Sequence, residues 1–409
     1  MYQLGIHLYI AIFRVVSIFN KKARKMVLGH RETWKKLKNE FDPNHEWLWF
    51  HAASLGEFEQ GRPVMDQIRE TYPNYKILLT FYSPSGYEVR KNYAGADLIC
   101  YLPFDTYLHA KKFIKTVKPK LVFFIKYEFW PNYLRRLRKE EIPTYLISGI
   151  FREDQLFFKK WAGYYRDLLE TFNHIFVQNK ESVELLKSIG RKKDVSISGD
   201  TRFDRVLEIK EQAKEYPILD AFKKKALDKV ILIAGSTWPK DEELVLAYFN
   251  EHEKIQLIIA PHEIHEDHIR EIESKISRSS IRLSKANTDT IANYDCIIID
   301  SFGMLSSAYR YGEIAYIGGG FGTGIHNTLE AAVYEIPIMF GPNYSKFQEA
   351  KSLLKMGGGV VVESKNDYYA QMDSWLYNEN ERTLAGKNAG EMVLNGCGGT
   401  EKVLLTVPL

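Results

Sequence analysis

Residues 229–235 read Lys-Val-Ile-Leu-Ile-Ala-Gly, a continuous apolar run that ends in a glycine. Runs of the same kind stand on both sides of it, and the segments between them carry apolar residues at helical spacing. Continuous apolar runs bounded by turn residues are typical of parallel strands buried on both faces, and their alternation with helices is typical of βαβ units. The pattern therefore predicts an α/β protein with parallel sheets.

The expected strands form two groups separated by a charged stretch. The first group comprises residues 47–51, 76–82, 98–103, 120–127, 142–148, 174–178 and 195–199. The second comprises residues 229–235, 255–260, 296–300, 314–318, 336–340 and 359–363. Segments with helical spacing lie between the strands of the first group, at 59–71, 106–117, 131–140 and 181–189. A charged stretch with helical spacing runs from Phe203 to about Lys225, so we expect two Rossmann-like domains that face one cleft and join near residues 201–225.

The length and composition agree with this organisation. At about 150 residues per domain, a chain of 409 residues predicts two to three domains. Apolar residues make up 45% and charged residues 26%, which excludes a disordered chain, a collagen-like chain and a polytopic membrane protein. Cys100, Cys296 and Cys397 form no CxxC pair, which excludes a disulfide framework and indicates a reducing compartment. The net charge of +4 is too small to indicate a nucleic-acid partner.

The N-terminal end differs from the rest of the chain. Residues 2–19 (YQLGIHLYIAIFRVVSIF) are mostly apolar, and a basic run at 20–25 follows at once. Gln3, His7 and Arg14 interrupt the apolar segment, which is barely long enough to span a bilayer. A cleaved signal peptide would carry its charges before the apolar core. We expect this segment to contact a membrane, as a marginal span or as a helix in the interface, with a helix packed on its own protein as the alternative.

The first group of strands leads into a polar turn. Ser54 and Gly56 mark a tight strand-to-helix turn, and Glu57 falls on the first turn of the following helix. A helix N-terminus favours the ionised form of a carboxylate there, and an ionised carboxylate at a cleft edge is a candidate general base toward a hydroxyl group. The alternative is that Glu57 only caps the helix.

A glycine-rich segment, residues 318–330 (GGGFGTGIHNTLE), runs from a strand of the second group into a helix. Glycines let backbone amides approach an anion, and the helix N-terminus adds positive partial charge. No GK[ST] follows, so the segment is not a Walker A loop, and it stands too late in its domain for a dinucleotide fingerprint. We expect it to bind a phosphate or a nucleotide sugar, with a simple turn as the alternative. The strand-end loops at 234–237, 260–263 and 341–349 would lie beside it.

Several metal-dependent motifs are absent from the sequence. There is no D-x-D, no HExxH and no GxSxG. Residues 262–268 (HEIHEDH) could share helix faces, but metal sites normally draw ligands from more than one helix turn. We therefore expect no metal site, and we expect amides, the helix dipole and cations to stabilise any phosphate leaving group.

Motifs spread from about residue 28 to 390 resemble, in the same order, those of the 3-deoxy-D-manno-octulosonic acid (Kdo) transferases of bacterial lipopolysaccharide synthesis (glycosyltransferase family 30). They are His51-Ala-Ala-Ser54-Leu-Gly56-Glu57, Tyr101-Leu-Pro103-Phe-Asp105-Thr106, Glu128-Phe-Trp130-Pro131-Asn132, Gly199-Asp-Thr-Arg-Phe203-Asp204, Gly318-Gly319-Gly320 with His326-Asn327-x-Leu329-Glu330, and Gly341-Pro342-Asn343. The resemblance implies the GT-B fold with a membrane-associating N-terminal helix at 1–27. An acceptor domain at 28–204 and a CMP-sugar donor domain at 205–409 would follow. The last helix is expected either to stay in the donor domain or to pack on the acceptor domain.

The resemblance also implies a mechanism. Glu57 matches the base that deprotonates an acceptor hydroxyl, which attacks the anomeric carbon of CMP-Kdo with inversion and releases CMP, without a metal ion or a cofactor. The donor-binding positions that match are Ser236, Pro261, His262, Gly319, Gly320, Asn327 and Glu330. The acceptor-side positions are Ser54, Gly56, Lys126 and Glu128. Lys126 stands where the family usually has a glutamate, and His262 stands where an arginine is frequent.

The partners implied by the resemblance are CMP-Kdo, a phosphorylated and acylated disaccharide (the lipid A precursor lipid IVA) and the cytoplasmic face of the bacterial inner membrane. No nucleic acid is expected. Two alternatives stay open: another GT-B enzyme, a transferase or epimerase that uses a UDP-sugar, and a catalytically inactive protein that tethers a partner to the membrane.

Overall fold

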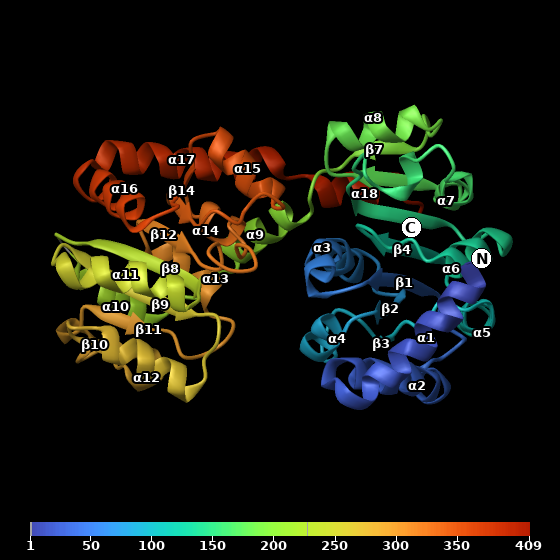
Figure 1. Cartoon of the computed structure of the whole chain (residues 1–409), viewed down its shortest axis with the longest axis horizontal. Helices are drawn as coiled ribbons and strands as arrows, with labels where there is room; N and C mark the ends of the chain where they lie inside the picture. Colours follow the sequence, from blue (N-terminus) through green and yellow to red (C-terminus); the bar gives the residue numbers. More distant parts are fainter. Residues whose placement is uncertain (1, 227) are drawn as a thin grey trace. The chain divides into compact units, whose positions relative to one another are not determined.

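The structure is a computed structural model that describes residues 2–226 and 228–409. The chain divides into two compact units, Met1–Arg205 with Cys397–Leu409 and Val206–Gly396 (Figure 1). Each unit contains one seven-stranded sheet, and all strand pairs between the described residues are parallel. This is the α/β architecture of two Rossmann-like domains that the sequence predicts.

The first unit has the strand order β3-β2-β1-β4-β5-β6-β7. Its strands are β1 Trp47–Ala52, β2 Lys76–Phe81, β3 Leu98–Tyr101, β4 Leu121–Ile125, β5 Thr144–Gly149, β6 His174–Val177 and β7 Val195–Ile197. Its helices are α1 Tyr2–Phe19, α2 Lys21–Glu40, α3 Leu55–Thr71, α4 Pro84–Arg90, α5 Tyr107–Val117, α6 Pro131–Lys139, the 3-10 helix η1 Leu156–Phe158, α7 Gly163–Leu169, α8 Lys180–Ser188 and α18 Gly399–Thr406.

The second unit has the strand order β10-β11-β9-β8-β12-β13-β14. Its strands are β8 Val230–Thr237, β9 Ile255–Pro261, β10 Ser280–Arg282, β11 Cys296–Ile298, β12 Ile314–Ile317, β13 Ile338–Phe340 and β14 Gly359–Val361. Its helices are α10 Pro217–Lys225, α11 Pro239–Glu251, α12 Glu266–Lys275, α13 Leu305–Ala308, α14 Leu329–Ala332, α15 Gln348–Lys355, α16 Lys365–Tyr377 and α17 Glu379–Gly396, with the 3-10 helices η2 Leu283–Lys285, η3 Ile291–Asn293 and η4 Tyr309–Tyr311. Helix α9, Arg202–Glu211, crosses the boundary between the units.

Each expected strand overlaps an observed one, and two expectations need correction. The sequence did not predict β10, an edge strand with the short sequence Ser-Ile-Arg, because a single apolar residue gives no run. The stretch expected to be helical from 203 to 225 is two helices, α9 and α10, since Pro217 has no backbone N–H to continue a helix and instead occupies the first position of α10.

Aromatic side chains fill the core of the first sheet. Trp49 packs against Phe113 and Phe124 on one face, with ring centroids 5.0 and 5.4 Å apart. On the other face, Phe50 stacks on Phe123 with centroids 4.5 Å apart. All of these rings are fully buried. Much of the chain's aromatic content therefore forms the layers between this sheet and its helices.

Helix α1 is attached to the first unit at its beginning. The hydroxyl of Tyr2 donates to Asp105 at 2.6 Å, and the side-chain amide of Gln3 donates to Asn132. Tyr2–Phe19 has a mean hydropathy of 1.5 and is apolar enough to cross a membrane, yet only 11% of its residues are buried in the protein. Its large exposed hydrophobic side chains are Leu4, Leu8, Tyr9, Ile12, Val15, Val16, Ile18 and Phe19. The helix therefore combines an anchored edge with an open apolar face.

The C-terminal helix α18 belongs to the first unit because a carboxylate holds its start. Asp204 accepts hydrogen bonds from the backbone amides of Gly398, at 2.6 Å, and Thr400, at 2.7 Å. Hydrogen bonds to an ionised acceptor are among the stronger ones in proteins. Gly399 is equally constrained, since a Cβ there would lie 2.8 Å from the carbonyl oxygen of Ser198.

We expect Asp204→Ala to destabilise the first unit by about 3 kcal/mol, the contribution of two hydrogen bonds to a charged group. Urea unfolding followed by tryptophan fluorescence measures this loss. Glu211→Ala, at the exposed end of the same helix, is the matched control and should unfold like the wild type. Equal stability of both variants would show that Asp204 does not hold α18.

Candidate functional site

Glu57 lies at the carboxyl edge of the first sheet. Strand β1 ends at Ala52, Ser54 is the N-cap of α3, and Glu57 falls in its first turn. The Ser54 hydroxyl donates a hydrogen bond to the Glu57 carboxylate. The carboxyl ends of parallel strands form the ligand-binding edge of open α/β sheets, and the helix N-terminus stabilises a negative charge there. Because Glu57 is only partly buried and Gly56 is exposed, the carboxylate is accessible at this edge.

Glu128 has a different environment. The residue is only 7% exposed. Its Oε2 accepts a hydrogen bond from Nε1 of Trp130 at 2.6 Å and lies 3.2 Å from Nε2 of His51. Nδ1 of His51 lies 2.9 Å from the hydroxyl oxygen of Thr80. A buried carboxylate needs such partners, so Glu128 joins the ends of β1 and β2 to the loop after β4 rather than facing solvent.

Lys126, Tyr127 and Arg152 form a cluster next to Glu57. Lys126 follows β4 in the left-handed conformation, with φ of 65°. Its Nζ and the guanidinium carbon of Arg152 each lie 5.2 Å from the ring centroid of Tyr127. Arg152 also donates a hydrogen bond to the Tyr127 hydroxyl at 3.0 Å. Burial raises the pKa of Tyr127, Arg152 opposes this rise and the charge of Glu57 adds to it, so the cluster and Glu57 interact electrostatically.

A cavity of about 630 Å³ adjoins this cluster at the carboxyl edge. It is lined by Phe151, Arg152, Glu153, Lys180, Glu181, Glu184 and Leu185. Lys180 begins α8, and the side chain of the N-cap Asn179 accepts a hydrogen bond from the backbone amide of Ser182. The cavity therefore offers cations, carboxylates and a helix N-terminus to a polar ligand.

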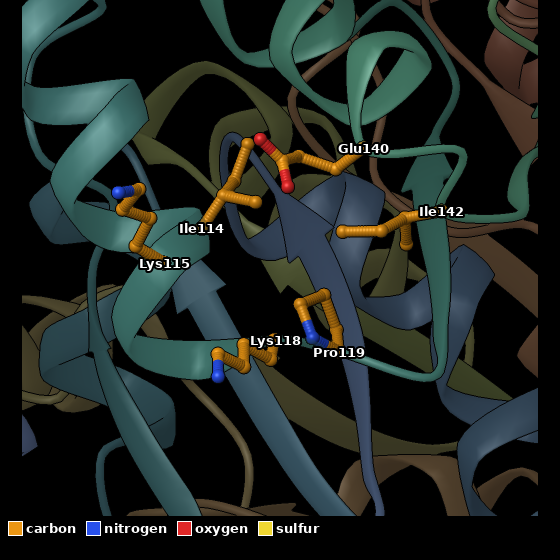
Figure 2. A pocket seen from close by; sticks show the side chains of 6 residues that line it. All are labelled: Ile114, Lys115, Lys118, Pro119, Glu140 and Ile142. Atoms are coloured by element: carbon orange, nitrogen blue, oxygen red, sulfur yellow. The ribbon is translucent and has the colours of Figure 1, made fainter.

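Another cavity, of about 550 Å³, lies at the opposite ends of the strands (Figure 2). Its lining residues are Ile114, Lys115, Lys118, Pro119, Glu140 and Ile142. Pro119 precedes β4 and Ile142 precedes β5, so this cavity is at the amino edge of the sheet. None of the residues expected at the site lines it.

In the second unit, Asp241 organises the carboxyl edge. The residue is 1% exposed and lies in the first turn of α11. Its Oδ2 accepts from the backbone amides of Gly319, at 2.8 Å, and Trp238, at 2.9 Å, and its Oδ1 accepts from the hydroxyl of Tyr316 at 2.8 Å. One carboxylate thus joins the ends of β8 and β12 to the glycine-rich segment. The Gly319 amide, expected to hold the donor substrate, is engaged inside the protein.

The glycines of this segment are required by close backbone approach. A Cβ on Gly318 would lie 2.3 Å from the carbonyl oxygen of Ser236, and a Cβ on Gly320 would lie 2.5 Å from the backbone of Gly341. Ser236 itself adopts a left-handed conformation with φ of 54°. The ends of β8, β12 and β13 therefore meet with no room for side chains between them, which brings Ser236, Gly319 and Gly320 together.

Three rings cover this edge. Nε1 of Trp238 donates a hydrogen bond to Nε2 of His326 at 3.2 Å. The ring of His262 stacks on both, with its centroid 4.7 Å from that of Trp238 and 4.5 Å from that of His326. His262 follows Pro261 at the end of β9 and is exposed. The rings provide a flat surface of the kind on which a nucleobase stacks.

Asn327 and Glu330 lie at the start of α14. The side-chain amide of Asn327 donates to Glu330 at 3.0 Å, and the amide oxygen of Asn327 accepts from the backbone amide of Leu329 at 3.1 Å. Both side chains are partly buried. The pair therefore places an oriented carboxylate beside the glycine-rich segment.

The histidine-rich stretch at 262–268 has a structural explanation. Nε2 of His268 lies 3.0 Å from the buried Glu242 carboxylate, and Nδ1 lies 2.8 Å from the carbonyl oxygen of Glu263. This pairing joins the start of α12 to α11 and holds the loop that carries His262. Among residues 2–226 and 228–409, no three His, Cys, Asp or Glu side chains gather in a metal-binding arrangement.

Comparison with known proteins shows which family the chain resembles. The family model for 3-deoxy-D-manno-octulosonic acid transferase (Kdo transferase) matches residues 23–205. A relative with this name from Aquifex aeolicus is 28% identical over 80% of this chain and 86% of its own length, and one from Rickettsia bellii is 27% identical over 93% and 92%. The chain resembles the Kdo transferases over most of its length, and the part that matches their family model lies in its first unit. These similarities support a glycosyltransferase.

The fold is that of a wider group of nucleotide-sugar enzymes. The UDP-GlcNAc 2-epimerase of Neisseria meningitidis, solved with UDP-GlcNAc, has a TM-score of 0.59 over 88% of this chain and 100% of its own, at 14% identity. At this identity the likeness concerns the fold, and it agrees with a GT-B-like architecture.

The structure brings the expected site residues together within each unit. Ser54, Gly56 and Glu57 share one turn, with Lys126 nearby and Glu128 in the buried network behind the edge. The donor-side residues gather around the glycine-rich segment. The sequence did not single out Trp238, Asp241, Tyr127 or Arg152 as site residues, and it included His326 only within a motif. For Asp241, the signal was its place three residues after Trp238, where a side chain caps a helix N-terminus.

The Glu242–His268 pair predicts a pH-dependent stability. Burial disfavours the charged imidazole, but the hydrogen bond and charge of Glu242 outweigh it and raise the pKa of His268 above its ordinary value of 6.5. The pair's contribution is therefore complete below pH 6.5 and is lost as the pH rises through the higher folded-state pKa.

We expect the stability difference between the wild type and Glu242→Gln to shrink as the pH rises from about 6 to above the folded-state pKa of His268. Urea unfolding across this range measures it. Glu243→Gln, at the exposed neighbouring position, is the control. Its free energy of unfolding should differ from that of the wild type by a small amount that does not change with pH. A difference for Glu242→Gln that stays constant with pH would contradict the assignment.

Proposed function

We propose that this protein transfers Kdo from CMP-Kdo to a lipid A precursor, lipid IVA, with inversion at the anomeric carbon and with Glu57 as the general base. The observation that carries the proposal is the accessible carboxylate of Glu57 at the carboxyl edge of the first sheet, oriented by Ser54 and the start of α3. A carboxylate in this position can accept the proton of a sugar hydroxyl as that hydroxyl attacks. The similarity to Kdo transferases supports the choice of donor.

The acceptor side supports an anionic, hydroxyl-rich substrate. Lys126 and Arg152 flank Tyr127 beside Glu57, and Arg152 also lines the adjoining cavity. A phosphate on the acceptor would gain charge-assisted hydrogen bonds from these side chains. Glu128 contributes indirectly, because its network with His51 and Trp130 fixes the chain that carries Lys126.

The donor side supports a nucleotide sugar. The stacked ring of His262 suits a pyrimidine base, and the Glu330 carboxylate held by Asn327 suits ribose hydroxyl groups. The amide of Gly320 and the hydroxyl of Ser236 lie where the strand ends converge and can donate to the phosphate. The proposed reaction uses no metal ion and no cofactor, since these amides and the helix N-termini stabilise the departing CMP.

The acyl chains of the acceptor imply a membrane surface, and α1 supports this part of the proposal. Most of its exposed side chains are apolar, although Gln3, His7 and Arg14 are exposed too, and the basic run Lys21–Lys25 follows directly. Lysine and arginine near anionic lipid headgroups contribute roughly 1 kcal/mol each. We propose that α1 associates with the cytoplasmic face of the inner membrane.

The test of the reaction combines CMP-Kdo with lipid IVA in detergent and EDTA, with the product detected by mass spectrometry. We expect the wild type to form Kdo-lipid and Glu57→Gln to lose about 10²- to 10⁴-fold in kcat, the usual range for a general base. Glu70→Gln, exposed at the far end of α3, should remain fully active. CMP should raise the melting temperature whereas UDP should not. Full activity of Glu57→Gln, or stabilisation by UDP alone, would contradict the proposal.

The acceptor assignment is tested at Arg152. We expect Arg152→Gln to raise KM for lipid IVA about tenfold, the value of one charge-assisted hydrogen bond to a phosphate, and to leave KM for CMP-Kdo unchanged. Arg138→Gln is the control, because Arg138 pairs with Asp167 on α7. An equal rise in both KM values, or none, would show that Arg152 does not bind the acceptor.

A further inference from the structure

The hydrogen bond between Trp238 and His326 fixes a proton position. An indole N–H donates and cannot accept, so Nε2 of His326 must carry the lone pair that accepts it at 3.2 Å. A neutral imidazole with an accepting Nε2 has its proton on Nδ1. Trp238 therefore selects one of the two tautomers of His326.

The environment keeps this imidazole neutral. Burial and the neighbouring His262 lower the pKa of His326 to about 4. His262 stacks above it, and Gly319 lies at its edge, where a Cβ would come within 3.1 Å of Cδ2 and 3.3 Å of Nε2. At neutral pH the ring is thus an uncharged group with one N–H donor.

That donor is available. Within residues 2–226 and 228–409, no protein atom accepts a hydrogen bond from Nδ1 of His326, and this nitrogen is not among the fully buried unpartnered atoms. His326 stands in the glycine-rich segment, at the carboxyl edge where ligands of such sheets bind. The Gly319 amide of the same segment is already engaged by Asp241. In this segment the Gly319 amide is therefore used inside the protein, whereas the Nδ1–H of His326 is available as a side-chain donor.

We propose that Trp238 is a positioning residue that holds His326 in the Nδ1–H tautomer, and that this N–H donates a hydrogen bond to an anionic oxygen of the donor substrate. The inference rests on the proposed function for the identity of that substrate. CMP-Kdo offers two groups with such oxygens, the nucleotide phosphate and the Kdo carboxylate. The neutral Nδ1–H can donate to either of them.

The test begins with the tautomer, which does not depend on activity. In protein labelled with ¹⁵N-histidine, the two ring nitrogens of His326, assigned by comparison with His326→Asn, report which one is protonated. We expect a protonated Nδ1 in the wild type and a changed spectrum in Trp238→Phe, which keeps an aromatic ring but removes the N–H. Trp161→Phe, at a residue 72% exposed in the first unit, is the matched control and should leave the His326 signals unchanged.

Ligand binding then identifies the oxygen. We expect Trp238→Phe to weaken binding by about three- to tenfold, the range for one hydrogen bond. Weaker binding of CMP assigns the phosphate, whereas unchanged CMP binding with a raised KM for CMP-Kdo assigns the carboxylate. His326→Asn, whose amide N–H can replace Nδ1–H, should retain more affinity than His326→Gln, whose longer side chain reaches the Nε2 position.

Two results would overturn the inference. One is a wild-type spectrum with the proton on Nε2, and the other is a changed tautomer in Trp238→Phe with CMP binding and KM for CMP-Kdo both unchanged. If the wild type forms no Kdo-lipid and binds neither CMP nor CMP-Kdo, the proposed function fails and the substrate part of the inference fails with it, while the spectrum still decides the tautomer.

Discussion

The carboxylate of Asp241 is the contact on which the geometry of the second unit depends. It is almost completely buried, and its charge is compensated by two backbone amides and a tyrosine hydroxyl from separate segments. A buried charge without such partners would be strongly unfavourable, so the three donors have to converge. Their convergence turns Trp238 toward His326, holds the glycine-rich segment against β8 and gives His262 its stacking surface. The buried contacts of Asp241, rather than contacts with a substrate, thus arrange the donor-side groups.

In the first unit, the carboxylates of Glu128 and Glu57 differ in burial. Glu128 lies behind the sheet edge, and its Oε2 is engaged by Trp130 and His51. Glu57 stands on the first turn of α3, where the helix N-terminus stabilises its charge and leaves it accessible. The two carboxylates belong to one sheet edge, and Glu57 is the more exposed of the two. Lys126 and Arg152 lie on either side of Tyr127 at that edge.

The sequence predicted the elements formed by contiguous residues and missed the contacts between residues far apart in the chain. Buried parallel strands are continuous apolar runs, so all but the short β10 could be recognised, and the turn that carries Glu57 and the glycine-rich segment are contiguous motifs. The pairing of Trp238 with His326 spans 88 positions and that of Asp241 with Gly319 spans 78. No periodicity records such contacts, because they arise only when β8 and β12 pair. The use of the Gly319 amide within the protein could not be predicted for the same reason.

The proposed role of Glu57 is to remove a proton from the attacking hydroxyl. Azide is an anionic nucleophile that needs no deprotonation, so it separates this role from donor binding. The decisive measurement is the rate at which Glu57→Ala converts CMP-Kdo and azide into Kdo azide, compared with its rate of transfer to lipid IVA. We predict that the variant loses transfer to the lipid but forms Kdo azide of inverted configuration at a rate close to that of the wild type. Loss of both reactions with CMP binding intact, or retention of lipid transfer, would contradict the account.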